Sequence, residues 1–342
     1  MDAKAPVLAV LAGLAVLAAG LQLAGYDAAT ALSALWQGAF GSWYAFNSAT
    51  LVRAVPLVVI GLALSLAFRG GALNIGAEGQ FYAGAMAATW AGLHVATQPP
   101  AVAVAAVLAA AMLAGLAWVA LPVWLKLRFG VLEVISTLLL NFVAESLVSL
   151  MVQGPLQEAQ HIYPQSDPIA ETARLPLIPG TRLHAGLAVA LVVMVMLWYL
   201  FARTLWGFRL RAVGAGPRAA EVSGLIDTRR MGAVALLGSG LLAGLAGGIE
   251  VSGVSYALYQ NLSPGYGFTG IAVALLARLH PFGVLLTGIL FGALEAGAGA
   301  MQRDAGVPAV AVYVVEAVVI VVVLLADAAS RRGLAPASEA AA

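Results

Sequence analysis

Cysteine is absent from this chain of 342 residues. Its absence excludes a disulfide framework, a thiolate metal site and a cysteine nucleophile. The four histidines lie far apart without metal-ligand spacing, so we expect no metal site. The chain also lacks G-x-x-x-x-G-K-[ST], the loop that holds nucleotide phosphates, and clustered Asp or His with catalytic spacing. We therefore expect no cofactor in this chain and no enzymatic activity of its own.

Charge is scarce as well. Only 10% of the residues are charged and 62% are hydrophobic, with a mean hydropathy of +0.96. A soluble domain has about 25% charged and about 45–50% apolar residues. Because a lipid-embedded backbone must satisfy its own hydrogen bonds, long apolar runs predict helices. We therefore predict an all-α, polytopic membrane protein.

Apolar runs of spanning length predict about ten transmembrane helices. They lie at residues 6–25, 51–68, 79–97, 101–125, 132–153, 183–202, 231–255, 268–279, 282–300 and 308–326. We interpret the short eighth run as a half-helix or a re-entrant element. Pro6 to Leu23 is longer than the 7–15 residues of a signal-peptide core, so we favour a retained helix there over a signal peptide.

The basic residues predict the orientation. With ten crossings and a cytoplasmic start, most Lys and Arg fall on the inner side, whereas Arg174, Arg182 and Arg303 fall in outer loops. This positive-inside distribution predicts that both termini are cytoplasmic. We expect one transmembrane domain over residues 1–327 and a short cytoplasmic tail over 328–342. Residues 203–230 form the only substantial inner loop.

A polar segment that contains four glycines, near residues 70–80, interrupts the apolar sequence. Non-helical backbone at membrane depth persists only where protein covers it or where it lines a watery cavity. Asn74, Glu78 and Gln80 are costly in hydrocarbon, so they face a bundle interior or a pathway. Two interpretations stay open: these side chains line a solute pathway, or they hold the break in place, with Glu78 paired to Arg69.

A polar stripe runs along the predicted helix 132–153. Thr137, Asn141, Glu145 and Ser149 recur at every fourth position, on one face of that helix. Such a stripe either bonds to neighbouring helices or faces water. A charge at the bilayer centre costs about 2.5–3.5 kcal/mol on insertion scales, so we expect Glu145 to turn inward. We favour pathway lining for Thr137, Asn141 and Glu145, with interhelical hydrogen bonding as the alternative.

Several sequence pieces together match a known pattern. In chain order they are Gly71-Ala-Leu-Asn-Ile-Gly-Ala-Glu-Gly-Gln80, Glu133-Val-Ile-Ser-Thr137 followed by Asn141, Val213-Gly-Ala-Gly-Pro-Arg-Ala-Ala220 with Ser223-Gly-Leu-Ile226, and Gly265-Tyr-Gly-Phe-Thr-Gly-Ile-Ala-Val-Ala274 with Pro281-Phe-Gly283. Over residues 50–325 the chain resembles the membrane-spanning permease subunit of bacterial ABC importers for nucleosides and simple sugars. Its Gly-Ala-Glu-Gly-Gln form resembles the longer of two paired permeases in nucleoside systems. Ala277-Arg-Leu-His280 departs from the Gly-Arg/Lys-Asn-like stretch of relatives.

The resemblance implies a fold like the type II ABC importers, in the bacterial inner membrane. It implies a second homologous permease subunit, an extracytoplasmic substrate-binding protein or lipoprotein, and an ABC ATPase that binds ATP and Mg²⁺. It also implies a nucleoside as solute, with a simple sugar as the next choice. No nucleic acid is expected as a partner.

The inner loop carries the predicted contact with the ATPase. After the Gly214-Ala-Gly-Pro217 break, a short helix with small residues on one side can dock into a groove of a partner. We expect this coupling role for Arg218, Ala219, Ala220, Glu221, Ser223 and Gly224. The alternative is an ordinary basic loop held at lipid headgroups.

A different class of transporter competes with this interpretation. An ion-coupled secondary transporter would also explain the broken segment, because such folds place interrupted helices at the binding site. It predicts a clear inverted repeat and an essential carboxylate at the bilayer midplane. We find no convincing repeat in the sequence, so the ATP-driven importer is favoured.

Overall fold

The computed structural model describes residues 4–222, 226–308, 314, 317 and 321, with side chains from Gly13 onward. Within them the backbone is helical or irregular, apart from two isolated β-bridges. Every predicted run before residue 301 coincides with a helix. The last run lies mostly outside the described residues, and so do Ser223, Gly224 and the expected tail 328–342. The chain is thus an all-α, multi-pass membrane protein.

Six helices in the described part of the chain are long and apolar enough to cross a membrane. They span Trp43–Arg69, Pro100–Phe129, Glu133–Val152, Gly186–Arg203, Thr228–Ser255 and Pro281–Ala305. At the other predicted runs, helix Lys4–Leu23 is apolar and 20 residues long, whereas Ala77–His94 is less apolar and Tyr266–Leu276 is shorter. The total of about ten therefore stays a prediction.

The chain divides into two compact units, residues 1–50 with 293–342, and residues 51–292. This division does not test the predicted single transmembrane domain over residues 1–327, which stays a prediction. The larger unit holds α4 (Leu51–Arg69), α5 (Ala77–His94), α6 (Pro100–Phe129), α7 (Glu133–Val152), α8 (Gly186–Arg203), α9 (Leu205–Ala215), α10 (Pro217–Val222), α11 (Thr228–Glu250), a π-helix (Val251–Ser255), α12 (Tyr266–Leu276) and the start of α13 (Pro281–Ala305).

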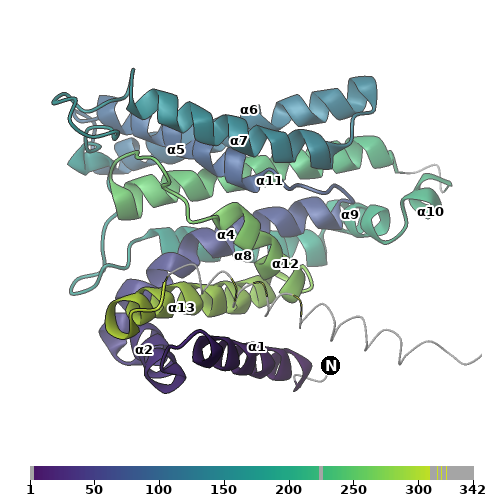
Figure 1. The fold of residues 1–342 in the computed structure, drawn as a ribbon. Coiled ribbons are helices and arrows are strands. Elements are labelled where there is room, and N and C mark those ends of the chain that lie inside the picture. Colours follow the sequence, from purple (N-terminus) through teal and green to yellow (C-terminus); the bar gives the residue numbers. More distant parts are fainter. Residues whose placement is uncertain (1–3, 223–225, 309–313, 315–316, 318–320, 322–342) are drawn as a thin grey trace, which may run out of the picture. The chain divides into compact units, whose positions relative to one another are not determined.

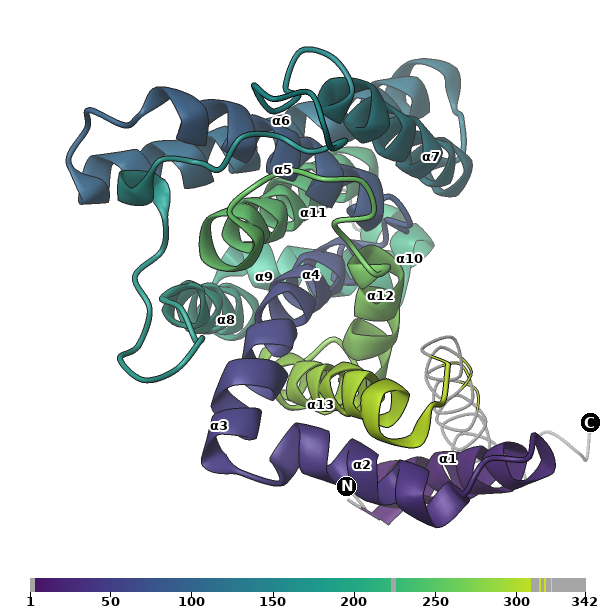
Figure 2. The same ribbon diagram turned by 60° about the vertical axis from the view of Figure 1, so that its left-hand side comes forward.

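Helix α11 is central in the larger unit. It packs against α6, α5 and α4, and both views place it between α5 and α6 on one side and α4 on the other (Figures 1 and 2). Of the most apolar stretches of α4 and α11, 83% and 78% are buried, against 28% in α6 and in α7. Helices α4 and α11 therefore form the interior, whereas α6 and α7 expose apolar side chains such as Leu121 and Leu139.

Small residues let α11 approach its neighbours closely. A β-carbon at Gly244 would overlap the Ala111 carbonyl oxygen, and one at Gly84 would overlap the Gly244 carbonyl oxygen. Gly240 meets Val119 and Gly115 of α6 in the same way. Spacings of four between small residues are typical of tightly crossed membrane helices. The glycines of α11 thus explain why its backbone is almost fully covered.

The smaller unit contains α1 (Lys4–Leu23), α2 (Ala28–Phe40), α3 (Trp43–Ala45), a π-helix (Phe46–Thr50) and the second half of α13. Asp27 caps α2 by accepting a hydrogen bond from the Ala29 amide at 3.0 Å. Helix α2 packs along α13, since a β-carbon at Gly38 would overlap Ala300. Trp36 and Trp43 are exposed, as residues of a membrane–water interface are.

Candidate functional site

The broken segment between α4 and α5 is a partly buried turn. Gly71 has a φ of +73°, a conformation that glycine adopts without strain, and the Ala72 amide donates to the Ala67 carbonyl at 3.0 Å to close α4. Asn74 is fully buried, and Gly76 is buried as well. Around Asn74 and Gly76 the protein itself covers the irregular backbone, as lipid requires, whereas Gly71 and Leu73 are exposed.

Asn74 satisfies all of its hydrogen-bonding groups inside the protein. Its amide nitrogen donates to Gln80 Oε1 at 2.8 Å and to Ser239 Oγ at 2.9 Å. Its amide oxygen accepts from the Gly76 amide at 2.9 Å and from Gln80 Nε2 at 3.0 Å. Because each donor and acceptor has a partner, burying these polar groups carries little penalty. Asn74 thereby ties the break to α5 and to α11.

Helix α7 holds the same break from the other side. The Thr137 hydroxyl accepts from the Ile75 amide at 3.3 Å. Asn141 donates to the Ile75 carbonyl at 2.8 Å and accepts from the Gly79 amide at 2.8 Å. We define Asn74, Gln80, Thr137, Asn141 and Ser239 as the break cluster. Its members come from four separate segments, so it joins α5, α7 and α11 around the irregular turn.

Glu78 holds the start of α12. Its Oε2 accepts from the Gly267 amide at 2.5 Å, and a β-carbon at Gly267 would overlap the Glu78 backbone. A carboxylate at a helix N-terminus satisfies a free amide and complements the helix dipole. Arg69 has other partners, the Leu279 carbonyl at 2.9 Å and the Phe201 ring at 4.7 Å. The Arg69–Glu78 pairing that the sequence left open is therefore replaced by two separate contacts.

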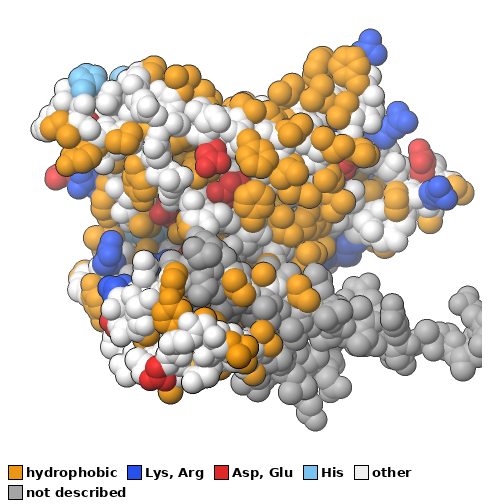
Figure 3. Space-filling view, in the orientation of Figure 1, with side chains coloured by type: hydrophobic (Ala, Val, Ile, Leu, Met, Phe, Trp, Pro, Cys, Tyr) orange, Lys and Arg blue, Asp and Glu red, His pale blue; other side chains and the backbone are white. Residues whose placement is uncertain are grey.

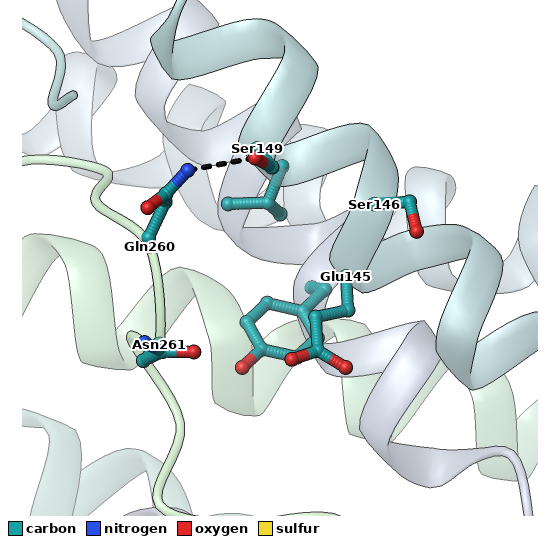
Figure 4. Close-up of a pocket in the computed structure, with 7 residues that line it drawn as sticks. Glu145, Ser146, Ser149, Gln260 and Asn261 are labelled. Carbon is teal, nitrogen blue, oxygen red and sulfur yellow. Dashed lines mark hydrogen bonds between the residues drawn. The ribbon is translucent and has the colours of Figure 1, made fainter.

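Glu145, four residues beyond Asn141, occupies a different environment: its side chain is exposed in this chain rather than turned into the protein interior, because the helices around it leave an open space on that face. It lines a pocket of about 390 Å³ together with Tyr82, Ser146, Val148, Ser149, Gln260 and Asn261. Figure 4 shows Gln260 and Asn261 on the segment before α12, facing Ser149 and Glu145 on α7. Gln260 Nε2 donates to Ser149 Oγ at 2.7 Å and bridges the two sides. A carboxylate, hydroxyls and amides therefore converge on a space of ligand size.

The structure thus separates the residues predicted to line a pathway. Asn74, Gln80, Thr137 and Asn141 lie together in the break cluster, Glu78 lies at α12, and Glu145 alone lines the pocket. Sequence reasoning missed Ser239, Gln260 and Asn261. The adjacent polar pair Gln260-Asn261 beside apolar helices was a usable signal, whereas Ser239 lies among glycines and gave none.

The predicted coupling residues fall on α10 and just beyond it. Arg218, Ala219 and Glu221 are exposed, and Ala220 is buried. Ser223 and Gly224 lie outside the described residues. Helix α10 follows α9 after Gly216, at the end of the larger unit where Figure 1 labels it. Basic side chains gather at that end in the space-filling view (Figure 3).

Comparison with known proteins gives a family match and full-length relatives. Residues 46–324 match the family model described as the branched-chain amino acid transport system permease component. A glucose ABC transporter permease protein of Haloferax volcanii is 37% identical over 94% of this chain and 87% of its own length. A guanosine ABC transporter permease protein of Bacillus subtilis is 37% identical over 93% of this chain and 92% of its own. A second guanosine permease protein of that bacterium is 28% identical over 71% of this chain and 78% of its own.

Proposed function

The chain belongs to the family of branched-chain amino acid transport system permease components, and from this premise we propose that it forms one half of the solute pathway in an ATP-driven importer of nucleosides. Simple sugars are the second solute class. The proposal rests on one observation above all: the polar stripe of α7 ends in a ligand-sized pocket at Glu145. The permease provides the passage, and the energy comes from a separate ATPase.

The pocket chemistry supports a solute rich in hydroxyls. A carboxylate accepts hydrogen bonds from hydroxyl groups, and the amides of Gln260 and Asn261 both donate and accept. The volume of about 390 Å³ is at the lower end of small-molecule sites. Tyr82 also lines the pocket, but its side chain is only 4% exposed and leaves little ring surface for stacking. The polar lining suits the ribose of a nucleoside and a simple sugar alike.

A second, homologous permease is part of the proposal. Bacillus subtilis has two guanosine permease proteins similar to this chain, one markedly more similar than the other. That pattern supports a heterodimer in which this chain is the longer member. The other proposed partners are an extracytoplasmic binding protein and an ABC ATPase that binds ATP and Mg²⁺. We also propose that both termini of this chain lie in the cytoplasm, as the positive-inside distribution of its Lys and Arg residues predicts.

Helix α10 is the proposed contact with the ATPase. It is short, begins directly after a break at Gly216, and exposes the small residue Ala219 beside Arg218. A short helix of this kind can fit a groove and transmit a rigid-body movement. We expect Ala219→Trp to leave the permease in the membrane and to reduce co-purification of the ATPase. Undiminished co-purification would remove α10 from the contact.

Reconstitution of the complete transporter tests the function. Proteoliposomes with both permeases, the ATPase and the binding protein should accumulate radiolabelled nucleoside only with ATP and Mg²⁺, with or without a protonophore. Competition by unlabelled nucleosides and hexoses then ranks the two solute classes. Accumulation without ATP that collapses with a protonophore would instead indicate an ion-coupled secondary transporter.

A further inference from the structure

Helix α9 (Leu205–Ala215) is fixed directly at the end of a membrane span. Only Thr204 separates it from α8. The Thr204 hydroxyl accepts from the Gly207 amide at 3.0 Å and donates to the Leu200 carbonyl at 2.6 Å. A β-carbon at Gly207 would overlap that same carbonyl. Helix α9 is therefore held against the last turn of α8, at the depth where the span leaves the hydrocarbon.

One face of α9 is buried in the protein and the opposite face is apolar but uncovered. Gly207, Leu210 and Val213 form the buried face. Leu205 is 78% exposed and Phe208 59% exposed. Their spacing of three places them on one side of the helix, with Ala212 one turn beyond Phe208. Apolar side chains exposed side by side mark a surface that another apolar phase covers.

Arginines flank this apolar face. At 100° per residue, Arg209 lies on one side of the Leu205–Phe208 stripe and Arg211 on the other, and both are exposed. The helix sequence contains no acidic residue. The Arg211 guanidinium donates to the Phe201 carbonyl, and the Arg69 guanidinium lies over the ring of the same Phe201. The protein therefore holds two cations around one residue at the end of α8.

No carboxylate within the described part of the chain neutralises these cations. The ion pairs of Lys126 with Glu133 and of Arg230 with Asp227 involve other cations. Like charges held close together repel, and an anion between them relieves that repulsion. A guanidinium also binds phosphate oxygens in a bidentate geometry. The site thus combines anion-binding donors with an adjacent apolar face.

We propose that α9 binds the membrane surface through anionic phospholipid. Leu205 and Phe208 enter the boundary of the acyl chains. Arg211 and Arg69 bind one lipid phosphate, and Arg209, on the other flank of α9, binds the phosphate of a neighbouring lipid. An amphipathic helix with aromatic residues beside arginines is the pattern of an interfacial helix, and the cytoplasmic leaflet supplies anionic headgroups. Helix α10 follows α9 at Gly216, so the lipid-bound helix gives the proposed coupling contact a fixed base.

The first experiment measures depth, and the cysteine-free sequence makes it direct. Spin labels are placed singly by Leu205→Cys and Phe208→Cys in the full-length permease, in nanodiscs of phosphatidylcholine with phosphatidylglycerol. Val192→Cys, on the exposed face of α8, is the membrane reference, and Arg218→Cys on α10 is the aqueous one. We expect labels at 205 and 208 to be reached by oxygen more than by a water-soluble nickel complex. Accessibility equal to that at 218 would overturn the proposal, as would protection that appears only when the ATPase is bound.

The second experiment measures lipid preference. Native mass spectrometry compares phosphatidylglycerol retained by wild type, by the Arg209→Gln/Arg211→Gln variant and by Arg229→Gln/Arg230→Gln, which loses the same charge elsewhere. An arginine near an anionic surface contributes about 1 kcal/mol, or about fivefold in affinity. We therefore expect the α9 variant alone to lose at least fivefold in retention. Equal losses in both variants would show a general surface-charge effect and contradict the site.

Discussion

The two halves of α7 carry the same polar stripe into different environments. In the half nearer Glu133, Thr137 and Asn141 bond to the backbone of the break, and both are buried. In the other half, Glu145 faces the pocket and bonds to none of the described residues, and Ser149 meets only Gln residues. A polar side chain with every bond made inside the protein holds structure. A polar side chain that faces open space and has unused hydrogen-bonding groups is available to bind a solute.

A steric change beside the break cluster should have the largest effect. Gly267→Val places a side chain on the Glu78 backbone and separates α12 from α5. We expect little or no folded permease, measured by fluorescence-detected gel filtration of a tagged protein. Gly20→Val, where nothing lies within 4 Å, is the matched control and should express normally. Normal folding of Gly267→Val would contradict the close packing of α12 on α5 beside the break cluster.

Removing one amide side chain of the break cluster should lower the stability of the folded permease, but by less than Gly267→Val does. Asn141→Leu leaves the Ile75 carbonyl and the Gly79 amide without partners. A buried unsatisfied group costs about 1–3 kcal/mol, so we expect a loss of about 2–6 kcal/mol. The measurement is the apparent melting temperature in detergent, which should fall by several degrees. If stability is unchanged and only uptake declines, Asn141 belongs to the pathway instead.

Glu145→Gln should act on transport alone. The variant keeps the volume of the side chain but removes the charge that accepts hydroxyl hydrogen bonds. Hydrogen bonds to charged groups contribute about 1.5–3 kcal/mol, so we expect roughly a 10- to 100-fold loss of uptake rate at low solute concentration. Initial rates in proteoliposomes give this value, and the melting temperature should not move. Unaltered uptake would assign Glu145 to structure.

Removing the hydrogen bond between Gln260 and Ser149, which bridges the pocket, should have the smallest effect on uptake. Gln260→Ala and Ser149→Ala each break the 2.7 Å hydrogen bond between α7 and the segment before α12. Such a bond contributes about 0.5–1.5 kcal/mol, so uptake should change by no more than about tenfold. A double-mutant cycle on uptake should show that the two effects do not add. Additive effects would mean that the two side chains act independently.

Helix positions followed from the sequence because long apolar runs leave a chain few alternatives in lipid. The polar stripe on α7 could also be predicted, because a spacing of four residues places its members on one face of the helix. Which residues on that face find partners depends on what packs against it, and Ser239 on α11 is distant in sequence from Asn74. Likewise, Glu78 caps α12 because Gly267 admits it, and no local pattern around Glu78 indicates this.

The most direct test of the division of α7 is thiol accessibility along the helix in the cysteine-free chain. Single variants Glu145→Cys, Ser149→Cys, Thr137→Cys and Ala144→Cys are treated in membranes with a small, water-soluble thiol reagent. Ala144 is fully buried beside Glu145 and serves as the matched internal control. We predict modification at 145 and 149, slowed by solute in the assembled transporter, and none at 137 or 144. Modification at 137 as fast as at 145 would contradict the account.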